Sequence, residues 1–186
     1  KEDGMALREI PIEKAFTFIE PGPVVLVTTN DGGKNNVMTI SWHMVLDFDG
    51  RFAMSTGPWN HSFATMMKTK ECVIAIPPAA MAETVVRIGM CSGTDVDKFE
   101  TFHLEALRAK SVKAPLLAGA LACLECRVVD YVEKHGIVIL QCVNLWMDKG
   151  MKGRSTFHAV GDGTFVADGE RFSHRRIMKG KIPDGV

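Results

Sequence analysis

The sequence predicts a mainly β fold with helical inserts, organised as a Greek-key barrel. Many short apolar runs are bounded by Gly, Pro, Asn and Asp, whereas the segments with helical periodicity are few and short. This order of elements argues against a parallel βαβ sheet, which needs a crossover between its strands. No repeat, low-complexity tract or linker divides the chain, so we expect one domain over residues 5–186. Lys1 to Gly4 precede the first methionine, and we interpret them as a remnant foreign to that domain.

Strand signals occur along most of the chain, and turn signals separate them. Apolar and β-branched runs predict strands at 24–29, 38–46, 51–55, 72–76, 121–132 and 137–147, with shorter pieces at 157–160 and 164–167. Turns are expected at 30–33 and 47–50, and a hairpin at 134–136. A short amphipathic segment is expected at 12–19, and helices after Asn60, at 79–90 and around Lys98.

The clearest alternation runs through residues 38–46. Apolar side chains occupy every second position, at Met38, Ile40, Trp42, Met44 and Leu46. Because successive side chains of a strand point to opposite faces, we expect this set to pack against a core. The other face, with Thr39, Ser41 and His43, is then available to bind a ligand.

Composition excludes several classes of protein. The chain has 186 residues, enough for a core without disulfides, and its 22 basic residues balance its 22 acidic ones. The chain therefore has no overall electrostatic field that would attract nucleic acid or an acidic membrane. The longest apolar run, 115–124, is far shorter than the roughly 20 residues that span a bilayer. The five scattered cysteines, an odd number, favour a reducing compartment, so we expect a cytoplasmic protein with no secretory signal.

The stretch 55–65 predicts a seat for an anion. An apolar strand ends at two hydroxyls, Ser55 and Thr56, and turns through 57–58 before a helix begins after Asn60, a good N-cap residue. The free N–H groups of the helix should begin near His61 and Ser62, where a phosphate is favourably placed. Thr65 lies three residues after Ser62, on the same helix face. An ordinary capped helix whose hydroxyls face water is the alternative from this stretch alone.

The chain lacks the common sequence motifs for nucleotide binding and for metal binding. The chain has no G-x-G-x-x-G, no P-loop, no H-E-x-x-H, and no pair of histidines at chelating separation, so we assign no metal site. Cys123 and Cys126 match C-x-x-C, but within a strand they should face opposite sides of the sheet, one packed inward and the other not. His43 and His61 each lie beside hydroxyls and can donate to an anion or a carbonyl. We assign no catalytic side chain.

Four motifs occur together in an order that resembles the flavin reductase-like family, especially its flavoredoxin-type members. They are N-V-M-T-I-S-W at 36–42, S-T-G-P-W-N-H-S at 55–62 with Thr65, G-M-C-S-G-T-D-V-D-K-F at 89–99, and L-E-C at 124–126. The similarity runs from about Pro21 to Asp148, and the combination is more specific than any single motif.

This resemblance implies a split β-barrel that binds FMN, usually as a homodimer with the flavin near the subunit interface. Residues 38–42 would lie along the isoalloxazine ring, with backbone groups at 39–41 meeting its polar edge. Ser55 and Thr56 would approach the ribityl chain or phosphate. The cofactor-binding residues implied in this way are Asn36, Met38, Thr39, Ile40, Ser41, Trp42, Ser55, Thr56, Asn60, His61, Ser62, Thr65 and Lys98. Asn60 and His61 stand where the family often has a basic residue in the phosphate-binding turn, which weakens the charge complement for FMN.

The function implied is an FMN-dependent oxidoreductase that takes reducing equivalents from NAD(P)H or a protein donor. Its acceptor would be flavin, iron or a partner protein. The chemistry belongs to the flavin, so the lack of a catalytic dyad is expected. A non-catalytic FMN carrier or sensor is the alternative. Trp42 or Trp59 could flank the ring, although an aromatic on an apolar strand face more often lies in the core.

Overall fold

The computed structural model describes residues 7–150 and 155–186, so the expected remnant, Lys1 to Gly4, lies outside the described residues. The strands are β1 (Leu7–Glu9), β2 (Val25–Asp31), β3 (Lys34–Ile40), β4 (His43–Val45), β5 (Arg51–Ser55), β6 (Glu71–Ile76), β7 (Ala106–Leu107), β8 (Leu116–Leu117), β9 (Ala122–Val132), β10 (Ile137–Asp148), β11 (Phe157–Ala159) and β12 (Phe165–Ala167). The helices are η1 (Ile12–Lys14), α1 (Ala15–Ile19), α2 (His61–Thr69), η2 (Ala79–Met81), α3 (Ala82–Gly89), α4 (Lys98–Thr101), η3 (Glu133–His135) and α5 (Arg175–Met178). None of these described helices is long and apolar enough to cross a membrane.

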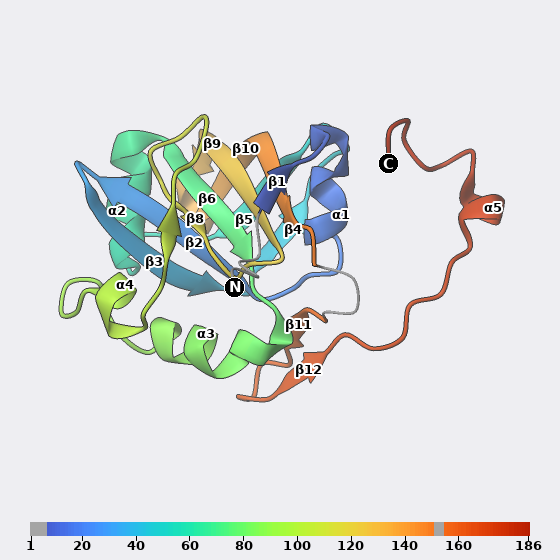
Figure 1. Ribbon diagram of the computed structural model, residues 1–186. Coiled ribbons are helices and arrows are strands. Elements are labelled where there is room, and N and C mark those ends of the chain that lie inside the picture. The colour runs from blue at the N-terminus through green and yellow to red at the C-terminus, as the bar shows by residue number, and fades with distance from the viewer. Residues whose placement is uncertain (1–6, 151–154) are drawn as a thin grey trace.

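One antiparallel sheet forms the body of the fold. Its strand order is β3-β2-β6-β9-β10-β5-β4, and β1 pairs with the far end of β10. The sheet curls on itself, with α2 at the left of the view and α1 at the right in Figure 1. Its two edge strands, β3 and β4, follow one another in the chain and are separated only by Ser41 and Trp42. The gap in the barrel therefore lies at this short connection.

Each face of the sheet packs against its own core. The inner core joins the inward residues of the curled strands to α1 and α2, with Leu124, Met54 and Met66 among its fully buried members. The outer core lies between the other face and α3, with Val85 and Ile88 at its centre. These cores bury most of the apolar side chains that the strand patterns marked.

The two cores show where the two cysteines of the C-x-x-C motif lie. Cys126 belongs to the inner core and Cys123 to the outer one, so the prediction that they face opposite sides is confirmed. The prediction that only one packs was wrong, because both thiols are fully buried. The sequence pattern could not show that the outer face is also covered. Burial raises the pKa of Cys123 to about 12, so this thiol stays protonated.

A buried carboxylate fixes the loop that precedes β8. Glu125 is fully buried and accepts hydrogen bonds from the backbone N–H groups of residues 110–112 and from Asn144 Nδ2 and Trp146 Nε1. Burial alone would raise the pKa of Glu125, but the donors, led by Trp146 and the N–H of Lys110, outweigh it and lower the pKa. The charged carboxylate therefore holds the loop to the sheet.

The alternating segment 38–46 is not one strand, which corrects the prediction. β3 ends at Ile40, and the chain bends through Ser41 and Trp42 before β4 begins. Met38 and Ile40 are buried as expected, but Trp42 is 76% exposed and Met44 56% exposed. The reason is that β3 pairs with β2 whereas β4 pairs with β5, so the apolar face turns outward at the bend.

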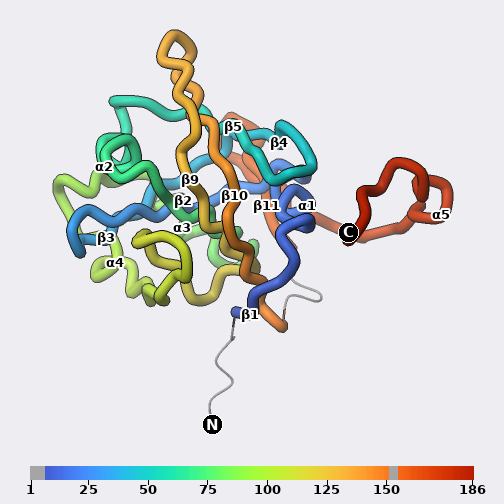
Figure 2. The backbone as a smooth tube through the Cα atoms, turned by 90° about the horizontal axis from the view of Figure 1, so that it is seen from above, coloured from blue at the N-terminus to red at the C-terminus, as the bar shows by residue number. Residues whose placement is uncertain are grey.

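The other strand predictions are confirmed to within a few residues, and the helices at 61–69 and 82–89 match those expected. The short elements β1, β7, β8 and α5 were missed, since so few residues carry little periodicity. The hairpin of β9 and β10 projects from the body, and the tail after β12 loops away from it (Figure 2). The tail returns at Gly185, beside Glu13.

Candidate functional site

The turn between β5 and α2 builds the first part of the site. Thr56 donates its N–H to Gly136 O at 2.9 Å, which ties this turn to the hairpin of β9 and β10. Asn60 occupies the N-cap position with an extended backbone, as expected, but its side chain makes no capping bond. Its Nδ2 instead donates to Thr56 Oγ1 at 3.1 Å. The first N–H groups of α2 are therefore not capped by Asn60.

Ser62 and Asn36 meet directly at the start of α2. Asn36 Nδ2, from β3, donates to Ser62 Oγ at 2.9 Å, and Ser62 is 1% exposed. Gly93 lies against the same amide, because a Cβ there would come within 2.5 Å of Asn36 Oδ1. The loop before α4 thus closes over a polar cluster that the sequence placed in two separate motifs.

His61 extends this cluster toward solvent. Its Nδ1 lies 3.0 Å from Thr94 Oγ1, in the loop that contains Gly93. Sequence reasoning assigned no role to Gly93 or Thr94, although both lie in the motif 89–99. We define the anion seat as Asn36, His61, Ser62, Gly93 and Thr94. Its hydroxyl, amide and imidazole groups, with the uncapped end of a nine-residue helix, suit an anion such as phosphate.

Lys98 lies beneath this loop. Its side chain is 5% exposed, and Nζ donates to Ile88 O at 2.9 Å. Burial lowers the pKa of Lys98, and the neighbouring Cys91 only partly offsets this. No described carboxylate forms an ion pair with Lys98, so this buried ammonium, four residues after Thr94 in the chain, has no countercharge from residues 7–150 or 155–186.

The predicted residues of β3 do not share one face. Met38 and Ile40 point into the inner core, while Thr39 points outward, where its Oγ1 donates to Val85 O at 2.7 Å. Gly89 lies against Thr39, since a Cβ there would come within 3.3 Å of Thr39 Cβ. Side chains from both faces cannot line one ligand. Because β3 is an edge strand, it can instead offer a ligand the backbone N–H and C=O groups along its unpaired edge.

A hollow lies at the gap of the barrel. Its volume is about 350 Å³, and its lining includes Ser41, Trp42, Met44, Ser55 and Ile137. The N–H of Ser55 donates to Trp42 O at 2.9 Å, which joins the bend after β3 to the end of β5. Trp42 and Trp59 are 76% and 69% exposed, so neither lies in the core, which is the more frequent place for an aromatic on an apolar strand face.

His43 lines the same hollow but is held neutral. Its Nε2 lies 2.6 Å from Pro23 O, and a carbonyl only accepts hydrogen bonds, so Nε2 carries the proton. Burial lowers the pKa of His43, although the bond to Pro23 opposes this shift. His43 therefore fixes the bend after β3 rather than supplying a charge.

The predicted residues thus fall into separate groups. The structure brings Asn36, His61 and Ser62 together in the anion seat, and Ser41, Trp42 and Ser55 around the hollow. Thr56 and Asn60 lie on the turn between these groups. Thr65 is half-buried one turn further along α2.

Sequence comparison decides the family. The sequence model described as the flavin reductase like domain matches residues 19–162, most of the chain. The chain belongs to the flavin reductase-like family. The uncharacterized protein YddH of Escherichia coli is 28% identical over 183 residues, which cover 88% of this chain and 97% of that protein.

Solved structures show the fold of this flavin reductase-like protein. An FMN-binding domain of a flavin reductases-like enzyme from Shewanella baltica has a TM-score of 0.85 at 22% identity, and the match covers 92% of this chain and 99% of that one. Flavoredoxin of Desulfovibrio vulgaris has a TM-score of 0.74 at 21% identity, covering 82% and 89%. A flavin reductase from Shewanella frigidimarina described as a split barrel domain has a TM-score of 0.70 at 16% identity, covering 82% and 84%. The predicted split barrel and the predicted family are both confirmed.

Proposed function

We propose that this flavin reductase-like protein binds FMN and passes reducing equivalents through it. The donor would be NAD(P)H or a protein, and the acceptor flavin, iron or a partner protein. The observation that carries the proposal is the anion seat, in which three segments distant in the sequence place polar groups around the start of α2. Family membership supports the same ligand, as do the neighbours named as FMN-binding proteins.

The residues present fit a phosphate group. The seat offers amide, hydroxyl and imidazole donors and the first N–H groups of α2, and Lys98 follows Thr94 by four residues at the start of α4. A side chain at Gly93 would fill the position next to Asn36, so this glycine keeps the approach open. A phosphate there would give Lys98 the negative partner that the described residues do not provide.

The hollow at the barrel gap suits an aromatic ring system. Trp42 and Met44 line it from one side and Ile137 from another, and Ser41, the residue that follows β3, lines it as well. The polar residues of its lining, Ser41 and Ser55, and its apolar walls match a ring system that is polar along one side. Bound FMN would supply the hydride or electron transfer, while these residues orient the ring and limit its contact with water.

A second copy of the chain is proposed to cover this region. The side chains around β4 that remain exposed include Trp42, Met44, Leu46, Phe48 and Trp59. Apolar groups gathered in this way are typical of a subunit interface. Sedimentation of the purified protein at micromolar concentration tests this point, and a monomer with FMN bound would contradict it.

An FMN titration tests the function most directly. Purified protein should quench FMN fluorescence with a saturable curve, and it should oxidise NADH or NADPH faster than an equal amount of free FMN. Ser62→Ala combined with Thr65→Ala should weaken binding, because each lost hydrogen bond to a charged group is worth about 1.5–3 kcal/mol. Absence of FMN binding would refute the proposal. FMN binding without nicotinamide oxidation would instead indicate a carrier, a sensor or a protein donor.

A further inference from the structure

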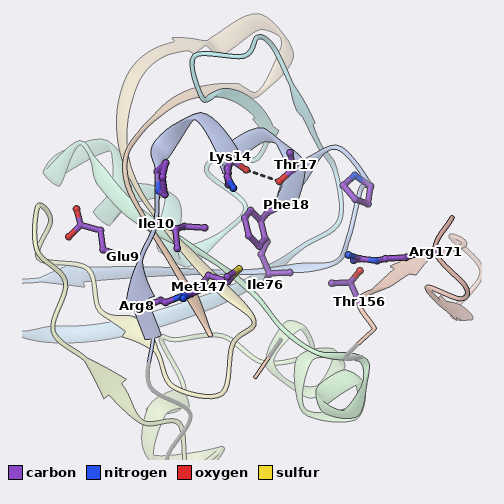
Figure 3. A pocket seen from close by; sticks show the side chains of 12 residues that line it. Arg8, Glu9, Ile10, Lys14, Thr17, Phe18, Ile76, Met147, Thr156 and Arg171 are labelled. Atoms are coloured by element: carbon purple, nitrogen blue, oxygen red, sulfur yellow. Dashed lines mark hydrogen bonds between the residues drawn. The ribbon is translucent and has the colours of Figure 1, made fainter. Parts of the chain in front are cut away.

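Another hollow, of about 610 Å³, lies apart from the residues assigned to FMN. It is enclosed by β1, η1 and α1, by the ends of β6 and β10, and by the start of the C-terminal tail (Figure 3). No residue assigned above to FMN is among the described residues that line it. Its volume is in the range of about 300–1,000 Å³ that is usual for small-ligand pockets.

The floor of this hollow is apolar. Ile10, Phe18, Ile76 and Met147 contribute to it, and Phe18 and Ile76 lie in the middle of the view in Figure 3. Phe18 is 8% exposed and Ile76 1% exposed, so both are held firmly by the inner core. A rigid apolar floor favours a ring or a short hydrocarbon chain.

The rim of the hollow is cationic. Arg8 from β1, Lys14 from η1 and Arg171 from the tail reach it from three separate segments, with Arg8 and Arg171 on opposite sides of Phe18 in Figure 3. Within residues 7–150 and 155–186, none of these three side chains forms an ion pair. Three cations without partners around one hollow attract an anion.

Glu9 does not cancel this charge. Of the described residues that line the hollow, it is the one carboxylate, and both of its oxygens lie 2.8 Å from Lys110 Nζ. Alternation along β1 places Arg8 and Ile10 on one side and Glu9 on the other. Figure 3 accordingly shows the Glu9 carboxylate directed away from Phe18.

We propose that this hollow binds an apolar carboxylate, with its ring or chain on the floor and its carboxylate at the cationic rim that Arg8, Lys14 and Arg171 form. The planar guanidinium fork matches a carboxylate with two parallel hydrogen bonds. An inorganic anion would leave the apolar floor unused, and a neutral hydrocarbon would leave the cationic rim unused. The proposal stands on residues separate from the FMN site, so either can fail without the other.

Calorimetry with matched ligands tests the proposal on the full chain without FMN. The probes are 3-phenylpropionate and octanoate, and the neutral control is 3-phenylpropionamide, which has the shape of the first acid without its charge. At least one acid should bind with a stoichiometry of one, and the amide should bind at least about tenfold more weakly. Arg8→Gln and Arg171→Gln should each weaken the acid about tenfold, since a lost charge-assisted hydrogen bond is worth about 1.5–3 kcal/mol.

Arg176→Gln is the matched control, because Arg176 is exposed in the same tail and does not line the hollow. It should bind the acids as the unchanged protein does. Arg171 lies outside the strands and helices, so its replacement keeps the test valid even if Arg8→Gln fails to fold. Equal affinity for acid and amide, no binding of either acid at millimolar concentration, or unchanged affinity in Arg171→Gln would overturn the proposal. Displacement of the acid by FMN would overturn it too, because the hollow would then be part of the flavin site.

Discussion

Replacing Gly93 by alanine probes the anion seat at its narrowest point. The new Cβ would lie 2.5 Å from Asn36 Oδ1 and 2.6 Å from Asn36 Nδ2, closer than carbon packs against either atom. Gly93 is not among the glycines with positive φ, so its backbone accepts alanine without strain. The substitution therefore acts on the Asn36 amide, which must rotate and release Ser62.

Gly93→Ala should lower both the stability of the fold and its affinity for FMN. Loss of one neutral hydrogen bond, between Asn36 and Ser62, should lower the free energy of unfolding by about 0.5–1.5 kcal/mol. For a chain of this length that is a fall in Tm of about 1–6 °C. FMN loses a charge-assisted contact at the seat, worth about 1.5–3 kcal/mol, so its Kd should rise by about 10- to 150-fold.

Thermal unfolding of the protein without FMN and fluorescence titration with FMN measure these two effects. Gly169→Ala is the control, because a Cβ there meets nothing within 4 Å. It should match the unchanged protein in both assays. If Gly93→Ala loses stability but keeps its FMN affinity, the phosphate does not lie beside Asn36. If neither quantity changes, the contact between Gly93 and Asn36 is itself wrong.

Three further predictions concern buried or half-buried groups. Lys98→Met should weaken FMN binding about tenfold or more. The same substitution should raise the Tm of the protein without FMN at neutral pH, because burial lowers the pKa of Lys98 and disfavours its charge. The gain should vanish above the ordinary lysine pKa of about 10.4, and a lower Tm at pH 7 would contradict this account. Glu125→Gln should destabilise the fold by about 3 kcal/mol in urea at pH 7. Since the folded pKa of Glu125 is lowered, its contribution should fade as pH falls below the ordinary value of 4.5, and an equal deficit at pH 3 would be inconsistent with it. Alkylation of the native protein should label Cys91 alone, because the other four cysteines are buried, and mass spectrometry of the labelled peptides would reveal any second site.

The local sequence was enough to predict the positions of most of the barrel strands. The strand at 51–55 was predicted to the residue, and Gly136, with φ of 60°, ends the hairpin loop where the sequence placed it. These features depend on side-chain alternation and turn chemistry within a few residues, which the sequence shows directly. The bend after Ile40 was not predictable in this way, because the apolar alternation continues through it while the pairing strand changes from β2 to β5.

The anion seat was predictable in residue type but not in arrangement. Motifs marked Asn36, His61 and Ser62, yet the bond between Asn36 and Ser62 joins positions 26 residues apart. Thr94 reaches His61 across 33 residues, and the motif 89–99 that contains Thr94 gave it no role. Such pairs depend on how β3, α2 and the loop before α4 pack, and no local pattern contains that information.

The sequence by itself determined where most of the strands, turns and helices lie, the alternation of side chains within each continuous strand, and which family the chain belongs to. Only the tertiary structure decided what covers each face. It buried both Cys123 and Cys126, left Trp42 in solvent, and brought Arg8 and Arg171 to the rim of one hollow from opposite ends of the chain. Alternation fixes the direction of a side chain relative to its own backbone, but its surroundings depend on segments that long-range packing places beside it.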